Sequence, residues 1–146
     1  NNVANSLMIC GALLEVEVRI ACPKGYEPDP ILIEKIHEIY NNKSSLQITN
    51  EPLNAVSGAN VLYTDVWSSM GEENQRERKD KDFYGFTIDT DLVNKADKDA
   101  IVLHCLPAYR NKEITDEIFE SKKSRIFEQA ENRMHVQQAL LAALIS

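Results

Sequence analysis

Apolar residues recur with two different periods along the first 25 residues of the chain. From residue 3 to residue 14 they recur every three or four positions, which predicts a helix with Asn2 as its N-cap. From Val16 to Cys22 apolar and polar side chains alternate, and this period of two predicts a strand. The Pro23-Lys24-Gly25 sequence that follows is a turn signal and would end the strand.

Helix and strand patterns continue to alternate along the rest of the chain. Asp29 in the N-cap position and Pro30 at the first helical position predict a second helix, which Asn41-Asn42 would stop. Mostly apolar runs predict further strands at residues 46–49, 61–64, 101–103 and 125–127. Helical patterns or caps predict further helices at residues 50–56, 115–119 and 130–145. Residues 72–82 are almost wholly charged or polar, which is typical of a solvated helix or a mobile loop.

This alternation predicts an α/β fold with a doubly wound, mostly parallel, Rossmann-like sheet that carries helices on both faces. We expect the α/β domain to cover residues 1–128 and a C-terminal helix to cover residues 129–146. Because a helix opens the chain at once, we also expect the first strand of the sheet to be missing upstream of residue 1. Ligands bind beyond the carboxyl ends of the strands in such sheets, which is where candidate residues are sought.

The composition is that of one soluble globular domain, since 43% of the 146 residues are hydrophobic and 27% are charged. A net charge of −7 repels phosphate backbones and anionic lipids, so neither nucleic acid nor a membrane is an expected partner. No apolar run approaches the roughly 18 residues of a membrane-spanning helix. Cys10, Cys22 and Cys105 lack CxxC spacing, which argues against a disulfide framework or structural zinc site and favours a reducing compartment.

Three segments at the expected sheet rim carry chemically capable side chains, and each residue also has an ordinary structural explanation. Asp65 follows a strand, where an aspartate is more often a helix cap or turn former than a ligand. Cys105 could be a small buried hydrophobic residue, and His104 could be a residue at a strand end whose hydrogen bonds are made within the protein. Arg133 could be a solvated arginine, although positive charge is disfavoured near the start of a helix. The segments are residues 65–71 (DVWSSMG), 104–110 (HCLPAYR) and 129–135 (QAENRMH).

Taken together, these three motifs and their order resemble the carboxyl-terminal, ornithine-binding domain of ornithine carbamoyltransferases, in the aspartate/ornithine carbamoyltransferase superfamily. The likeness runs over essentially all 146 residues and includes Asn1-Asn2-Val3 and residues 21–28 (ACPKGYEP). A dinucleotide-binding fingerprint is absent, because no Gly-x-Gly occurs in the chain. The family's phosphate-binding Ser-Thr-Arg-Thr and His-Pro-x-Gln segments are absent too, so the resemblance implies that this chain holds the amino-acid half of the site.

The resemblance implies how ornithine would be held. Asn2 matches the second asparagine of the family's Gly-Asp-Gly-Asn-Asn turn and would bind the α-carboxylate. Asp65 and Ser69 would bind the α-ammonium, and the backbone of Met70 would help seat the α-carboxylate. A carboxylate opposite an ammonium group is also what charge matching favours.

The resemblance likewise implies the residues at the reacting atoms. Cys105 and Arg133 would be the catalytic residues, with Cys105 beside the δ-amine and Arg133 on the carbonyl oxygen of carbamoyl phosphate, where negative charge grows. Leu106 would accept a hydrogen bond from the carbamoyl amino group through its carbonyl, and Leu106-Pro107 would be a cis peptide. His104 belongs to the motif without an assigned role.

The implied reaction is carbamoyl transfer from carbamoyl phosphate to the δ-amine of L-ornithine, giving citrulline and phosphate in arginine biosynthesis. It implies no metal and no cofactor. The implied partners are the two substrates, an amino-terminal carbamoyl-phosphate domain against which the last helix would pack, and two further copies in a homotrimer, in the cytoplasm.

Three alternatives remain open from the sequence. A related carbamoyltransferase could take putrescine or an acylated ornithine, but an acceptor without a free α-ammonium would leave Asp65 unpaired. A nucleotide-binding Rossmann-like domain is a possibility of a different class. A non-catalytic relative used for assembly or regulation is the third, although Asp65, Cys105 and Arg133 are all present.

Overall fold

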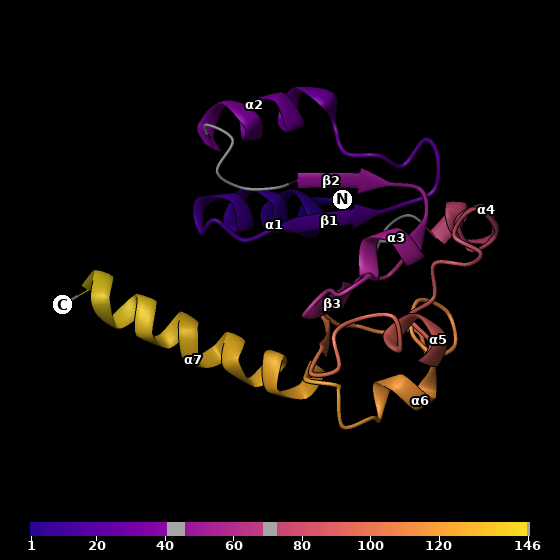
Figure 1. Ribbon diagram of the computed structural model, residues 1–146. Coiled ribbons are helices and arrows are strands. Elements are labelled where there is room, and N and C mark those ends of the chain that lie inside the picture. The colour runs from indigo at the N-terminus through magenta and orange to yellow at the C-terminus, as the bar shows by residue number, and fades with distance from the viewer. Residues whose placement is uncertain (41–45, 69–72, 146) are drawn as a thin grey trace. The chain divides into compact units, whose positions relative to one another are not determined.

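The computed structural model describes residues 1–40, 46–68 and 73–145, which form two compact units, Asn1–Ser57 and Gly58–Ser146 (Figure 1). The helices of the first unit are α1 (Asn2–Leu13), α2 (Pro30–Tyr40) and α3 (Pro52–Val56), and its strands are β1 (Val18–Ala21) and β2 (Leu46–Thr49). The strands of the second unit are β3 (Val61–Thr64) and β4 (Ile101–His104). Its helices are the 3₁₀ turn η1 (Glu73–Gln75), α4 (Arg76–Asp82), α5 (Thr90–Val93), α6 (Asp116–Phe119) and α7 (Ile126–Ile145).

The first unit is a parallel strand pair covered by helices on both faces. β1 and β2 pair in parallel, with Val18 opposite Leu46. Val18 and Ile20 point to one face, where they pack with Leu46 against a core from α1 and α2. Arg19, between them, points to the other face and donates to the carbonyls of Ala55 and Ser57 at the end of α3, at 3.2 and 2.6 Å. Because successive side chains of β1 point to opposite faces, Val18 and Ile20 contact the layer of α1 and α2, whereas Arg19 contacts α3.

The start of α1 differs from the prediction by one residue. Asn1, not Asn2, is the N-cap, since its side-chain oxygen accepts a hydrogen bond from the Ala4 N–H at 2.8 Å. Asn2 is the first residue of the helix itself. Asparagine is a favourable N-cap residue at either position, and the hydrogen bond from the Ala4 N–H identifies Asn1 as the cap.

Gly11, inside α1, is explained by a close approach to β1. A Cβ atom at this position would lie 2.3 Å from a methyl carbon of Val18, so only glycine lets the helix pack this closely on the strand. The beginning of α2 is as predicted, since Asp29 accepts from the Ile31 N–H at 2.8 Å and Pro30 is the first helical residue. The predicted stop at Asn41-Asn42 lies outside the described residues.

The second unit contains the other parallel pair. β3 and β4 pair in register, from Val61 opposite Ile101 to Thr64 opposite His104. Val102 and His104 of β4 are buried in the core, whereas Ile101 and Leu103 point to the opposite face and line a hollow beside α7. This face of β4 carries the candidate site.

One prediction for the second unit is wrong. Residues 125–127 were expected to form a strand, but pairing with β4 is limited to one bridge between Ser124 and Val102, and α7 already begins at Ile126. Tertiary packing favours the helix there, because Ile126 is fully buried and the rings of Phe127 and Phe119 pack edge to face, with their centroids 5.6 Å apart.

The sequence also gave no prediction for α5, although Asp89 is its N-cap and accepts from the Leu92 N–H at 2.8 Å. The polar segment at residues 72–82 is helical over its described part, as one of the two expectations had it. Parallel strands joined through helices confirm the α/β class. No helix in the described ranges is both long and apolar enough to cross a membrane.

Candidate functional site

Asp65 and Cys105 come together at the carboxyl ends of β3 and β4. Because Thr64 and His104 are opposite each other in a parallel pair, the next residue of each strand lies at the same edge. The Cys105 Sγ donates a hydrogen bond to Asp65 Oδ1 at 3.0 Å. The same carboxylate oxygen accepts from the Val66 N–H at 2.7 Å, which fixes the carboxylate toward the thiol. The strand pairing therefore juxtaposes two residues that lie 40 positions apart.

Cys105 is a neutral thiol in this environment. Burial, together with the hydrogen bond and the negative charge of Asp65, raises the pKa of Cys105 from 9.0 to about 12. A hydrogen bond with Tyr63 opposes this rise in part. Since the thiolate is the nucleophilic form of cysteine, a thiol with this pKa is poorly suited to forming a covalent intermediate near neutral pH.

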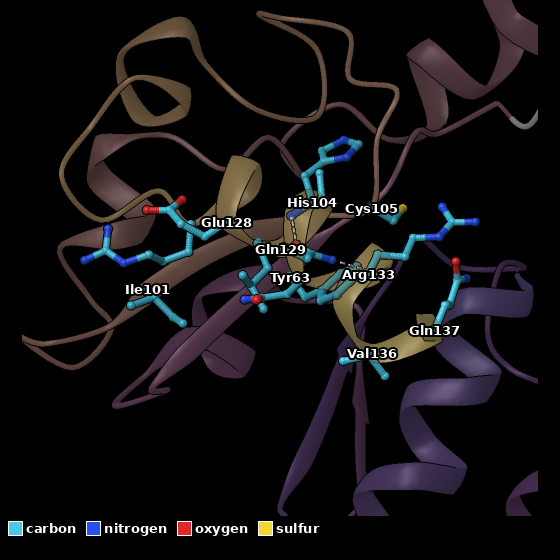
Figure 2. A pocket seen from close by; sticks show the side chains of 13 residues that line it. Tyr63, Ile101, His104, Cys105, Glu128, Gln129, Arg133, Val136 and Gln137 are labelled. Carbon is cyan, nitrogen blue, oxygen red and sulfur yellow. Dashed lines mark hydrogen bonds between the residues drawn. The ribbon is translucent and has the colours of Figure 1, made fainter. Parts of the chain in front are cut away.

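The Gln129 side chain links the first turn of α7 to β3 and β4 by hydrogen bonds (Figure 2). Its side-chain Nε2 donates to the Tyr63 hydroxyl at 3.0 Å, and its Oε1 accepts from the His104 backbone N–H at 3.0 Å. Burial, followed by the neighbouring Cys105, raises the pKa of Tyr63, so its hydroxyl stays protonated. The amide of Gln129 thus sets the position of α7 relative to β3 and β4.

Arg133 lies one helical turn after Gln129 and therefore on the same face of α7. It lines the hollow together with Tyr63, Leu103 and Cys105. Figure 2 shows its side chain projecting from α7 with the guanidinium at the far end. The structure thus places an exposed cation and a neutral thiol along one hollow of the second unit.

The Leu106-Pro107 peptide is cis, as the resemblance implied. Leu106 also has a positive φ of 59°, a left-handed conformation uncommon for residues other than glycine. Its backbone N–H donates to His104 Nδ1 at 2.9 Å, so the motif residues His104 and Leu106 contact each other directly.

The structure does not test the other predicted site residues. Ser69 and Met70 are outside the described residues. Asn2 belongs to the first unit, where it is exposed at the start of α1. The roles assigned to these three residues stay predictions, as do the substrate contacts assigned to Asp65, Cys105, Leu106 and Arg133. In the described ranges, no group of three or more His, Cys, Asp or Glu side chains is arranged to hold a metal ion.

Sequence reasoning missed three residues that shape the site. Tyr63 sits within an apolar strand, and its position one residue before the strand end was the only signal that it reaches the rim. Gln129 is the first residue of the 129–135 motif but was assigned no role. Glu113 is buried beside His104 although nothing in the local pattern distinguishes it from other charged residues.

Comparison with known proteins identifies the family. The family model described as "Aspartate/ornithine carbamoyltransferase, Asp/Orn binding domain" matches residues 1–144. An ornithine carbamoyltransferase of Prochlorococcus marinus subsp. pastoris is 76% identical over 145 residues, which are 99% of this chain and 47% of that protein. The chain therefore spans about half the length of the curated relatives it matches.

Solved structures agree with the sequence match. The crystal structure of anabolic ornithine carbamoyltransferase from Campylobacter jejuni superposes with a TM-score of 0.87 at 45% identity, over 96% of this chain and 46% of that one. Ornithine carbamoyltransferase from Pyrococcus furiosus superposes with a TM-score of 0.87 at 43% identity, over 94% and 44%. The resemblance noted from the three motifs is confirmed: the chain belongs to the aspartate/ornithine carbamoyltransferase family and carries its Asp/Orn binding domain.

Proposed function

We propose that the protein containing this chain transfers the carbamoyl group of carbamoyl phosphate to the δ-amine of L-ornithine, giving L-citrulline and phosphate. The observation that carries the proposal is the Asp65–Cys105 pair at the carboxyl ends of two parallel strands, in a chain of this family. A fixed carboxylate supplies the charge that an amino acid's ammonium requires. The relatives named above, which are ornithine carbamoyltransferases, support ornithine as that amino acid.

Ornithine recognition is assigned to four residues. Asp65 pairs with the α-ammonium, in which Ser69 assists, and Asn2 and the backbone of Met70 bind the α-carboxylate. The geometry around Asp65 supports its part, because the Val66 N–H already holds one carboxylate oxygen in place. A charge-assisted hydrogen bond between ammonium and carboxylate is stronger than a neutral one, which makes Asp65 the main determinant of affinity.

The reaction joins the δ-nitrogen to the carbamoyl carbon. The neutral amine attacks, the bond from carbon to the phosphate oxygen breaks, and the amine loses one proton as phosphate leaves. Arg133 stabilises the carbonyl oxygen as negative charge develops on it, and the Leu106 carbonyl accepts from the carbamoyl amino group. Cys105 lies beside the δ-amine as a neutral thiol, since its raised pKa disfavours the nucleophilic thiolate.

The partners of this chain follow from the same proposal. An amino-terminal half of the protein binds carbamoyl phosphate, and the segment 129–146 packs against that half. Exposed apolar side chains along α7 support such packing; they include Val136, Leu140, Leu141 and Leu144. We further propose a homotrimer in the cytoplasm that serves arginine biosynthesis, with no nucleic acid or membrane partner.

The test is a citrulline assay on the full-length protein, combined with calorimetry on two variants. Asp65→Ala should weaken ornithine binding by about 2–5 kcal/mol, because it leaves the α-ammonium desolvated and unpaired, and should leave carbamoyl phosphate binding unchanged. Asp99→Ala is the matched control, since Asp99 is exposed and pairs only with the exposed Lys98 among the contacts described. Equal weakening of both substrates in Asp65→Ala would show that Asp65 is structural.

An assay of acceptor-dependent phosphate release from carbamoyl phosphate separates the alternatives. Putrescine and N-acylated ornithine lack a free α-ammonium, so the wild-type protein should use them far less well than ornithine. A preference for either one would replace ornithine as the substrate. Full-length protein that releases no phosphate from carbamoyl phosphate with any of these acceptors would favour a non-catalytic relative. Thermal stabilisation by nucleotides instead of ornithine would favour a nucleotide-binding domain.

A further inference from the structure

A buried pair that the proposed reaction does not use lies beneath the turn that carries Cys105 and Leu106. The His104 and Glu113 side chains are 0% and 1% exposed, and Nε2 lies 3.1 Å from Oε1. The large majority of buried polar groups are hydrogen-bonded, so the contacts of each atom indicate what the pair does.

The contacts of the two ring nitrogens fix one tautomer of His104. Nδ1 lies 2.9 Å from the backbone nitrogen of Leu106, whose N–H can only donate. Nδ1 therefore carries the lone pair, and Nε2 carries the hydrogen that it donates to Glu113. The imidazole is neutral, and both of its nitrogens are occupied by these two bonds.

His104 is consequently not arranged to exchange a proton with its neighbour Cys105. The Cys105 thiol donates to Asp65 instead, at 3.0 Å. The backbone N–H of His104 is also engaged, since it donates to Gln129. Every contact described for His104 holds backbone or helix in place.

Glu113 binds the same turn at a second point. Its Oε1, which accepts from His104, also accepts from the backbone N–H of Tyr109. One carboxylate oxygen thus holds two peptide groups of the turn, directly at Tyr109 and through the imidazole at Leu106. Cys105 and the cis Leu106-Pro107 peptide lie within the turn that these bonds hold.

The backbone around Glu113 is itself anchored in the core. The Glu113 carbonyl accepts from the Ile88 N–H at 2.9 Å, and the next residue, Ile114, is 0% exposed. The Thr87 hydroxyl donates to the carbonyl of Lys112 at 2.5 Å. The carboxylate is therefore a rigid support, which is what orienting a neighbouring group requires.

We propose that Glu113 and His104 are positioning residues that orient the Leu106 carbonyl and the Cys105 thiol toward the carbamoyl group and the attacking amine. They act through the hydrogen bond from the Leu106 N–H to His104 Nδ1 and touch neither substrate. The inference rests on the proposed function for the identity of the substrates, but the hydrogen-bonded turn stands independently of it.

Two substitutions of His104 in the full-length enzyme test the role of each nitrogen. In His104→Asn the side-chain oxygen can still accept from the N–H two residues later, as in an Asx turn, whereas His104→Gln reaches Glu113 and loses that bond. We expect kcat to fall about 100-fold in His104→Gln and about tenfold or less in His104→Asn, with KM for ornithine changed by less than about threefold. The exposed His37→Asn is the matched control and should match wild type.

Equal losses of kcat in the two variants would overturn the proposal, because a proton-transfer role would be lost equally in both. A loss expressed mainly in KM for ornithine would overturn it as well. For Glu113, Glu113→Gln keeps an acceptor for both donors and should retain most of kcat, while Glu113→Ala should lose it. Similar losses in Glu113→Gln and Glu113→Ala would contradict support through hydrogen bonding.

Nitrogen NMR of the ¹⁵N-histidine-labelled wild-type enzyme gives a readout that needs neither folding of a variant nor activity. In the folded enzyme, His104 should have an unprotonated Nδ1 and a protonated Nε2. A proton on Nδ1 would overturn the inference, since the Leu106 N–H would then face another donor. An enzyme without citrulline activity but with this tautomer would refute the proposed function and leave the hydrogen-bonded turn intact.

Discussion

Replacing Asp65 by asparagine removes a full negative charge next to Cys105 and keeps the size of the side chain. The carboxylate oxygen lies 3.0 Å from the sulfur. Burial is the largest cause of the raised pKa of Cys105, and the hydrogen bond and charge of Asp65 come next. Asp65→Asn should therefore lower the thiol pKa from about 12 toward 9.0 without reaching it, because burial remains.

The size of the effect on reactivity follows from two opposing factors. A nearby charge shifts a pKa by about 1–3 units, and each unit of decrease raises the thiolate fraction tenfold well below the pKa. A less basic thiolate is also a weaker nucleophile, with a Brønsted coefficient of about 0.4–0.5. For a fall of about one to two units, alkylation of Cys105 should thus accelerate about 3- to 15-fold at pH 8.

The assay is the rate of iodoacetamide modification of Cys105 against pH, measured on the full-length protein by mass spectrometry of the peptide that contains it. The profile of Asp65→Asn should move to lower pH. Cys10 is exposed in the first unit and serves as an internal reference whose rate should not change. Asp99→Asn is the matched surface control.

Two results would refute this reasoning. An unchanged pH profile at Cys105 would mean that the Asp65 carboxylate does not hold the thiol in its protonated form. An equal acceleration at Cys10 and Cys105 would mean that the substitution loosens the protein generally and does not act through charge.

Further substitutions test the contacts around this pair and the packing and helix capping within each unit. Tyr63→Phe removes a hydrogen bond that lowers the pKa of Cys105, so it should slow alkylation, opposite in sign to Asp65→Asn; faster alkylation would contradict the contact. Gly11→Ala places a Cβ 2.3 Å from a valine methyl of β1 and should lower the free energy of unfolding in urea by about 1–3 kcal/mol, whereas the exposed Ser6→Ala should change it by less than about 0.5 kcal/mol. Asp89→Ala removes the cap of α5 and should cost about 1 kcal/mol in the same measurement, and no loss would show that the cap contributes nothing.

The sequence by itself determined most of the secondary structure and the place of the site. Helix-start signals and short apolar runs are local properties of the sequence, and they correctly predicted the helix that begins at Pro30 and the strand at residues 61–64. The family motifs then assigned chemistry to Asp65, Cys105 and Arg133. The order of strands and helices was enough to place the segments that follow β3 and β4 at one sheet edge.

Tertiary structure decided what local pattern leaves open. Residues 125–127 have strand-like side chains, yet burial of Ile126 and a single bridge to β4 favour an early start of α7. Glu113 resembles any surface glutamate in sequence, and only folding buries it against His104. The cause is the same in both cases: burial and hydrogen bonding depend on which distant residues meet, and a side chain's protonation state depends on those partners in turn.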